Sequence, residues 1–161
     1  MIISGVSACT GPANSESGCM SEETPKRRIL LVEDDDNDVI LVRHAFEKAG
    51  LDHELVIIED SRSAIDYLGG HPRFSQQAGY RLPDLVVLDL KLVGSSGFDV
   101  LAWIGSRAEL RGIRTVVFSS SWVEEDVQKA RQLGAAEYIV KPGGFDGLVE
   151  WGRKLHDKYL S

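Results

Sequence analysis

The sequence predicts an α/β fold, a doubly wound five-stranded parallel sheet with five helices covering both faces. Short runs rich in Val, Ile and Leu alternate with longer amphipathic segments, which is the pattern of successive βα units. The run at 85–88 is wholly apolar, as expected of a strand buried on both faces. The chain has 161 residues, 43% of them hydrophobic, which is enough for one domain with its own core.

Five strands follow one another at regular spacing, each bounded by turn residues or helical segments. We expect strands at 29–33, 55–58, 85–89, 115–118 and 137–140. The third of these ends on a carboxylate, Asp89, directly after an apolar run. A charge there indicates that the end of the strand opens into a cleft, where ligands bind in open α/β sheets.

Helices are expected between and after the strands, with apolar residues at helical spacing. Their predicted bounds are 36–49, 61–68, 96–107, 122–134 and 145–159. Ser61 is predicted to cap the second helix, and Ser121 with Glu124 to form a capping box for the fourth. Residues 70–83 form a connection that is longer than usual between such elements.

The domain organisation is simple. Residues 1–25 are small and polar without periodicity, so we expect a disordered tail, in which Met20 is an alternative start. Residues 26–161 are expected to form the single domain. The basic run at 26–28 that leads into it is interpreted as a solvated segment.

Composition excludes several partners and places. The net charge of -7 without a basic patch argues against nucleic acid. No apolar run approaches the roughly 20 residues of a membrane span. Both cysteines, Cys9 and Cys19, lie in the tail, so no disulfide supports the fold, which fits the reducing cytoplasm.

Polar side chains follow four of the expected strands. Glu33 and Asp34 end the first, Asp89 the third, Ser119 the fourth, and Lys141 follows the fifth. Because parallel strands all present their carboxyl ends at the same edge, these groups are expected to converge there.

The expected cluster suits phosphoryl transfer. Carboxylates crowded together repel one another unless a cation is present, and an all-oxygen ligand set favours Mg²⁺. Lys141 adds a fixed positive charge. With both cations neutralising phosphoryl oxygens, Asp89 is placed to attack phosphorus in line, and Ser119 to hydrogen-bond the bound group.

Each residue alone has an ordinary explanation. Acidic residues after a strand commonly cap helices, and Asp35, Asp36 and Asp38 are interpreted in that way. Serines after a strand are common in turns. The joint placement of complementary groups at successive strand ends is what favours a functional site.

Over residues 29–159 these motifs resemble the receiver domain of two-component response regulators, whose fold is flavodoxin-like with strand order 2-1-3-4-5. The resemblance rests on an acidic pair, a phosphoacceptor-like aspartate, a glycine, a hydroxyl, an aromatic residue and a Lys-Pro pair. These are Glu33-Asp34, Asp89, Gly97, Ser119, Tyr138 and Lys141-Pro142.

The resemblance implies a signalling role and not that of a turnover enzyme. Asp89 would accept a phosphoryl group from a histidine kinase or a histidine phosphotransfer protein, with at most slow self-dephosphorylation. Asp34, Asp89 and the backbone carbonyl of Lys91 would bind Mg²⁺, with Glu33 acting through water. Ser119 would move towards the phosphoryl group.

Switching would continue from the site to a surface. Tyr138 would turn inward behind Ser119, reshaping the face of the fourth helix, fifth strand and fifth helix. The long connection at 70–83 and the lack of an output domain after the last helix resemble stand-alone regulators that partner phytochrome-type kinases. These pair through that face, so a homodimer is expected, with Trp122 and Trp151 on or near it.

Three positions depart from the family's usual residues. Lys91 lies two residues after Asp89, where the family's rate of hydrolysis is set. Val93 replaces a proline of the following loop, and Ser119 replaces the commoner threonine. None of the three removes an essential group.

Two other functions remain open from the sequence. A Mg²⁺-dependent phosphatase with an aspartyl intermediate usually carries a second acid two residues after the nucleophile, where this chain has Lys91. A receiver-like scaffold that is never phosphorylated would be expected to lack a core site residue, and none is missing.

Overall fold

The structure, a computed structural model, describes residues 24–161. The expected tail lies almost wholly outside this range, as do Cys9, Cys19 and Met20, so its disorder stays a prediction. Within residues 24–161 no helix combines the length and apolarity that a bilayer crossing requires.

The predicted parallel sheet is present. Its strands are β1 (Arg28–Val32), β2 (Glu54–Ile58), β3 (Leu85–Leu88), β6 (Arg114–Ser119) and β7 (Glu137–Val140). Their order is β2-β1-β3-β6-β7, and every neighbouring pair is parallel. This arrangement confirms the expected order 2-1-3-4-5.

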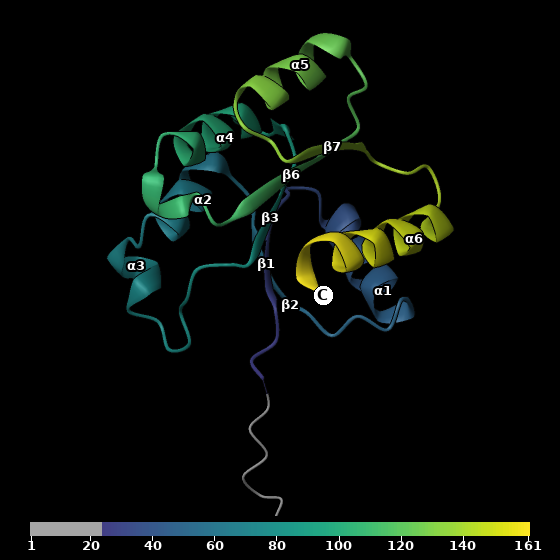
Figure 1. Ribbon diagram of the computed structural model, residues 1–161, viewed down its shortest axis with the longest axis horizontal. Helices are drawn as coiled ribbons and strands as arrows, with labels where there is room; N and C mark the ends of the chain where they lie inside the picture. The colour runs from purple at the N-terminus through teal and green to yellow at the C-terminus, as the bar shows by residue number, and fades with distance from the viewer. Residues whose placement is uncertain (1–23) are drawn as a thin grey trace, which may run out of the picture.

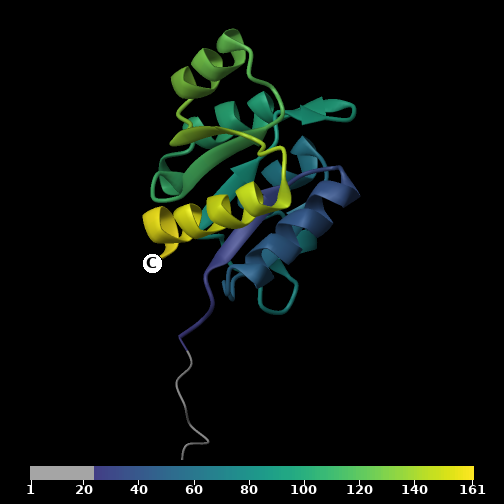
Figure 2. The same ribbon diagram turned by 90° about the vertical axis from the view of Figure 1, so that its right-hand side faces the viewer.

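Helices cover both faces of the sheet (Figures 1 and 2). They are α1 (Asp36–Lys48), α2 (Ser61–Leu68), α4 (Gly97–Gly105), α5 (Glu124–Gln132) and α6 (Phe145–Leu155). Helices α1 and α6 pack side by side on one face, and α2, α4 and α5 cover the other.

Two apolar cores explain why the central strands show no polar alternation. In β1, Leu30 and Val32 pack beneath α2 and α4, whereas Ile29 and Leu31 pack beneath α1 and α6. All four side chains are buried. A strand covered on both faces is apolar over its covered length, here 29–32, so the charged residues Arg28 and Glu33 fall at its two ends.

Small elements supplement the predicted ones. The long connection at 70–83 contains a short helix, α3 (Pro72–Ser75), and β4 (Lys91–Leu92) pairs with β5 (Ser95–Ser96) in a hairpin before α4. A 3-10 turn covers Ala108–Leu110. The last helix, expected to reach Tyr159, continues beyond α6 as a π-helical turn at His156–Leu160.

Two expected helix caps were wrong. Helix α2 is capped by Asp60, whose carboxylate accepts a hydrogen bond from the backbone N–H of Ser63, and Ser61 is its first residue. Helix α5 begins at Glu124 without a side-chain cap. The hydroxyl of Ser121 instead donates to Asp126 (Oγ–Oδ2 2.6 Å), and this competing bond removes the predicted capping box.

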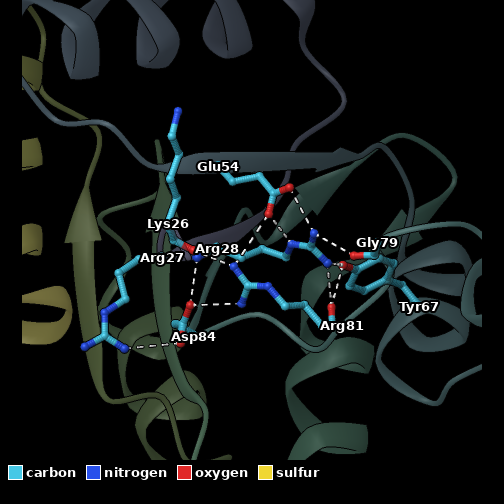
Figure 3. Close-up of polar contacts among 8 residues, drawn as sticks. All are labelled: Lys26, Arg27, Arg28, Glu54, Tyr67, Gly79, Arg81 and Asp84. Atoms are coloured by element: carbon cyan, nitrogen blue, oxygen red, sulfur yellow. Dashed lines mark hydrogen bonds and ion pairs between the residues drawn. The ribbon is translucent and has the colours of Figure 1, made fainter. Parts of the chain in front are cut away.

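The interpretation of the basic run at 26–28 as a solvated segment was wrong for Arg28, which is buried at the start of β1. Figure 3 shows its guanidinium reaching across to Glu54 on β2 and to the 70–83 connection. Nη2 lies 2.9 Å from both Glu54 Oε1 and the carbonyl oxygen of Gly79, and Nη1 lies 2.9 Å from that of Arg81. One side chain therefore fixes the long connection to the edge of the sheet.

We expect Arg28→Leu to lower the free energy of unfolding by about 2 kcal/mol, because it leaves carbonyl oxygens and Glu54 without their donor. Urea denaturation measures the change. Arg27→Leu is the matched control, since Arg27 is exposed and makes a longer ion pair with Asp84 (3.5 Å); it should change stability by less than about 0.5 kcal/mol. Equal losses would show that the Arg28 contacts contribute little.

Candidate functional site

The parallel register brings the expected carboxylates together. Glu33 and Asp89 directly follow β1 and β3, which pair Val32 with Leu88, so their main chains leave the sheet side by side. Asp34 follows Glu33. One carboxylate oxygen from each of these three residues lies within 4.8 Å of the others. The predicted acidic cluster is thus formed at the carboxyl edge of the sheet.

Lys141 is brought to the same cluster from the end of β7. Its Nζ lies 2.7 Å from Glu33 Oε2, 2.7 Å from Asp38 Oδ2 and 3.1 Å from Asp89 Oδ2. Its backbone N–H donates to the carbonyl oxygen of Ser119 at 2.8 Å, which ties the end of β7 to the end of β6. The ammonium group therefore lies among three carboxylates.

Asp38 is a site residue that the sequence pattern did not single out, because it was interpreted as a helix cap. The cap of α1 is Asp35 alone, whose side chain accepts from the backbone N–H groups of Asn37 and Asp38. The Asp38 side chain points instead to Lys141. Its place in the first turn of a helix that starts beside the acidic pair Glu33-Asp34 is the only sequence signal for this role.

Backbone donors orient the three carboxylates of the cluster. Asp89 Oδ1 accepts from the N–H of Lys91 at 3.1 Å, and Asp34 Oδ2 accepts from that of Val93 at 2.6 Å. Glu33 Oε1 accepts from the N–H of Asp35 at 3.1 Å. The loop after β3 therefore holds Asp34 and Asp89 in their relative positions.

Gly97 has a steric reason to be glycine. A Cβ built on it would lie 2.1 Å from the carbonyl oxygen of Asp89 and 2.8 Å from the Cα of Leu90. Its backbone N–H also donates to the carbonyl oxygen of Leu90 at 3.0 Å. The start of α4 thus presses directly against the main chain that carries Asp89.

Ser119 and Tyr138 meet at a common residue. The fully buried Ser119 accepts a hydrogen bond at Oγ from the backbone N–H of Ser121 (3.2 Å). The hydroxyl of Tyr138 donates to the carbonyl oxygen of the same residue at 2.8 Å, and its half-buried ring packs against the core beneath α2 and α4. A movement of Ser119 would therefore shift Ser121, and with it the acceptor of the Tyr138 hydroxyl.

Trp151, which was expected on or near the dimer face, is a core residue. It is 6% exposed and stacks on Phe118, with ring centroids 4.2 Å apart. Trp122, in contrast, is 80% exposed in the segment between β6 and α5. Trp151 thus points from α6 into the core between this helix, α1 and the sheet, where its ring buries a large apolar area against Phe118.

Burial and ion pairing oppose each other at this site. Burial raises the pKa of Glu33 to about 7, although the hydrogen bond from Lys141 acts in the opposite direction. Burial tends to lower the pKa of Lys141, but its hydrogen bonds to Asp38 and Glu33 outweigh that effect and raise it. Lys141 is therefore charged at neutral pH, and the carboxylates exceed the positive charge beside them.

This donor set fits a hard divalent cation. Glu33, Asp34 and Asp89 offer only oxygen ligands, which suit Mg²⁺. Lys141 neutralises a single charge among the carboxylates, so a bound cation would relieve the remaining repulsion.

A family model described as the response regulator receiver domain matches residues 29–151. The chain belongs to this family. It is therefore a phosphoacceptor signalling domain of two-component systems, and its acidic cluster is consistent with a phosphoacceptor site.

Curated relatives and solved structures agree with this assignment. The receiver domain is 36% identical to the response regulator Rcp1 of Synechocystis over 88% of this chain and 95% of Rcp1. It is 32% identical to FilR2 of Methanothrix harundinacea, a probable methanogenesis regulatory protein, over 90% of this chain and 91% of FilR2.

The phosphorylated cyanobacterial phytochrome response regulator RcpA superposes with a TM-score of 0.77 and 31% identity, over 85% of this chain and 96% of RcpA. A Mn²⁺-bound form of Rcp1 superposes with a TM-score of 0.74 and 30% identity, over 84% of this chain and 95% of that structure. A divalent cation is thus bound by a relative of this receiver domain.

The raised pKa of Glu33 makes stability depend on pH. In metal-free protein the folded state holds this proton up to about pH 7, whereas the ordinary carboxyl pKa is 4.5. The folded state binds more protons across that window, so the contribution of Glu33 to the free energy of unfolding falls as the pH rises, by about 1–3 kcal/mol.

Urea denaturation with excess chelator, compared between wild type and Glu33→Gln, isolates this effect. The variant should gain stability relative to wild type from about pH 5 to about pH 8, and the difference should level off outside the window. A difference that stays constant with pH would contradict the raised pKa.

Proposed function

We propose that Asp89 accepts a phosphoryl group from a histidine kinase or a histidine phosphotransfer protein in a Mg²⁺-dependent reaction. The observation that carries the proposal is the position of the Asp89 carboxylate between Lys141 and the acidic pair Glu33-Asp34. The receiver domain is proposed to span residues 26–161 and to act in the cytoplasm, where such kinases present their phosphoryl groups.

The chain's own residues would do most of the chemistry by position and charge. An oxygen of Asp89 forms a bond to phosphorus while the bond from phosphorus to the donor's histidine nitrogen breaks, and the imidazole leaves with the electron pair. Lys141 stabilises negative charge on the phosphoryl oxygens, and Ser119 hydrogen-bonds the transferred group.

Mg²⁺ is proposed to be held by Asp34, Asp89 and the backbone carbonyl of Lys91, with Glu33 acting through water. When bound, the cation would neutralise phosphoryl oxygens and the carboxylates around them. The contacts of Glu33 support binding to the cation through water, because its two carboxylate oxygens already accept hydrogen bonds from Lys141 and from the N–H of Asp35. The Mn²⁺-bound form of Rcp1 supports the presence of a cation.

A phytochrome-type kinase is the proposed source of the phosphoryl group. The similarity to Rcp1 and to the phytochrome response regulator RcpA supports this choice. Lys91, which lies exposed beside Asp89, is proposed to influence how quickly the phosphoryl group is lost.

The signal is proposed to leave the site through Ser119, Ser121 and Tyr138. Displacement of Ser119 towards the phosphoryl group would break its bond with Ser121, which also holds the Tyr138 hydroxyl. Tyr138 lies on β7, an edge strand of the sheet, so the change would reach the surface formed by α5, β7 and α6.

The two alternatives have less support. A phosphatase of the aspartyl-intermediate type would need an acid two residues after Asp89, and Lys91 stands there. A scaffold that is never phosphorylated would not require the Lys141 ammonium to be kept beside Asp89.

Incubation with acetyl phosphate and Mg²⁺ should add one phosphoryl group to the wild type, as read by intact mass, and none to Asp89→Ala. Asp99→Ala is the matched control, because Asp99 is exposed on α4, and it should be modified like the wild type. An undiminished adduct in Asp89→Ala would refute the role of Asp89. Multiple turnover on phosphate esters would favour the phosphatase. The absence of any adduct on the wild type would favour the scaffold.

We also propose a homodimer that forms through the surface of α5, β7 and α6. Exposed apolar side chains on or next to this surface support it, namely Trp122, Val140 and Phe145. We expect Trp122→Ala to weaken self-association at least about tenfold in sedimentation velocity, since exposed tryptophans dominate many interfaces. Val93→Ala, which removes an exposed apolar side chain from the β4–β5 hairpin, should leave it unchanged. Equal effects of the two variants would place the interface elsewhere.

A further inference from the structure

We propose that Asp38 is a positioning residue for Lys141. It holds the ammonium group while Asp89 is unmodified, and it is the partner that Lys141 gives up when a phosphoryl group arrives. This inference rests on the proposed function of Asp89 and adds a residue from α1 to the site.

The first step is a count of donors. A lysine ammonium has three hydrogens and no acceptor. In the structure Nζ contacts one oxygen each of Glu33, Asp38 and Asp89, so all three hydrogens are engaged. The first hydrogen bond to a phosphoryl oxygen can replace the bond to Asp89, whose own carboxylate loses its charge on phosphorylation. The phosphoryl group offers three acceptor oxygens, and a second hydrogen bond to it requires Lys141 to release Glu33 or Asp38.

Burial decides which of Glu33 and Asp38 is released. Glu33 is 2% exposed, so losing the hydrogen bond from Lys141 would leave a buried polar group without its donor, which is costly. The side chain of Asp38 is 32% exposed and can be hydrated again. Asp38 also lies in the first turn of α1, where the helix dipole stabilises a negative charge without any help from Lys141.

The charge change at Asp89 drives the exchange. When acetyl phosphate is the donor, an oxygen of Asp89 bonds to phosphorus, and acetate leaves with the electron pair of the broken phosphorus–oxygen bond. The single negative charge of Asp89 is replaced by about two on the phosphoryl group. The attraction of Lys141 towards that side of the site increases, while its attraction to Asp38 does not.

The exchange also has a structural consequence. Lys141 follows β7 and Asp38 lies on α1, so their ion pair joins parts of the chain that are 103 residues apart. Phosphorylation would open this link and leave the first turn of α1 without its tie to the segment before α6. The face formed by α1 and α6 would thereby respond as well as the face that contains Tyr138.

Two single-charge variants test the exchange. Asp38→Asn removes the partner that Lys141 must release, so at limiting acetyl phosphate with Mg²⁺ the ratio of phosphorylated to free protein should rise about threefold to fivefold over wild type. Asp36→Asn removes the same charge from the same helical turn at an exposed position, and it should change the ratio much less. Asp38→Glu, which keeps the carboxylate, should restore the wild-type ratio.

A spectroscopic measurement follows the carboxylate itself. In wild-type protein the ¹³C resonance of the Asp38 carboxyl group should shift on phosphorylation towards that of a hydrated aspartate such as Asp36. An unshifted resonance, equal ratios for Asp38→Asn and Asp36→Asn, or a lower ratio for Asp38→Asn would overturn the exchange. Failure of the proposed function is distinguishable, because wild type and all variants would then carry no adduct.

Discussion

A single ammonium group placed among carboxylates is the interaction on which the site depends. Glu33 and Asp89 are fixed side by side by the pairing of β1 with β3, and both are buried. Without Lys141 their repulsion would be uncompensated in the protein alone. Lys141 reaches them only because β7 runs parallel to the other strands and ends at the same edge of the sheet.

At both ends of β1, a buried charge is paired with an opposite charge from a distant part of the chain. The strand begins with a buried arginine and is followed by a buried glutamate, and between them every residue is apolar. Each charge is balanced by a distant part of the chain, Arg28 by Glu54 and Glu33 by Lys141. The arginine end fixes the 70–83 connection, whereas the glutamate end forms part of the site.

The parallel sheet and the convergence of Glu33, Asp34, Asp89 and Lys141 could be predicted, because they depend on local apolar runs and on the rule that parallel strands end at one edge. The strand order followed only from the resemblance to receiver domains, since apolar runs do not determine which strands are neighbours. The burial of Arg28 and Trp151 could not be predicted, because it is decided by partners far away in the sequence. Asp38 was missed for a related reason. A first-turn aspartate is ordinary, and only the path of Lys141 gives it a second contact.

The close approach of Gly97 to the main chain of Asp89 has a mechanical consequence. There is no space for even a methyl group between them, so the main chain of Asp89 packs directly against the first residue of α4. The backbone at Asp89 then has little freedom to yield when the side chain is modified. If Asp89 is phosphorylated as proposed, the displacement would therefore be taken up by the loops after β6 and β7, and the direction of the structural change would be set by the rigid contact at Gly97.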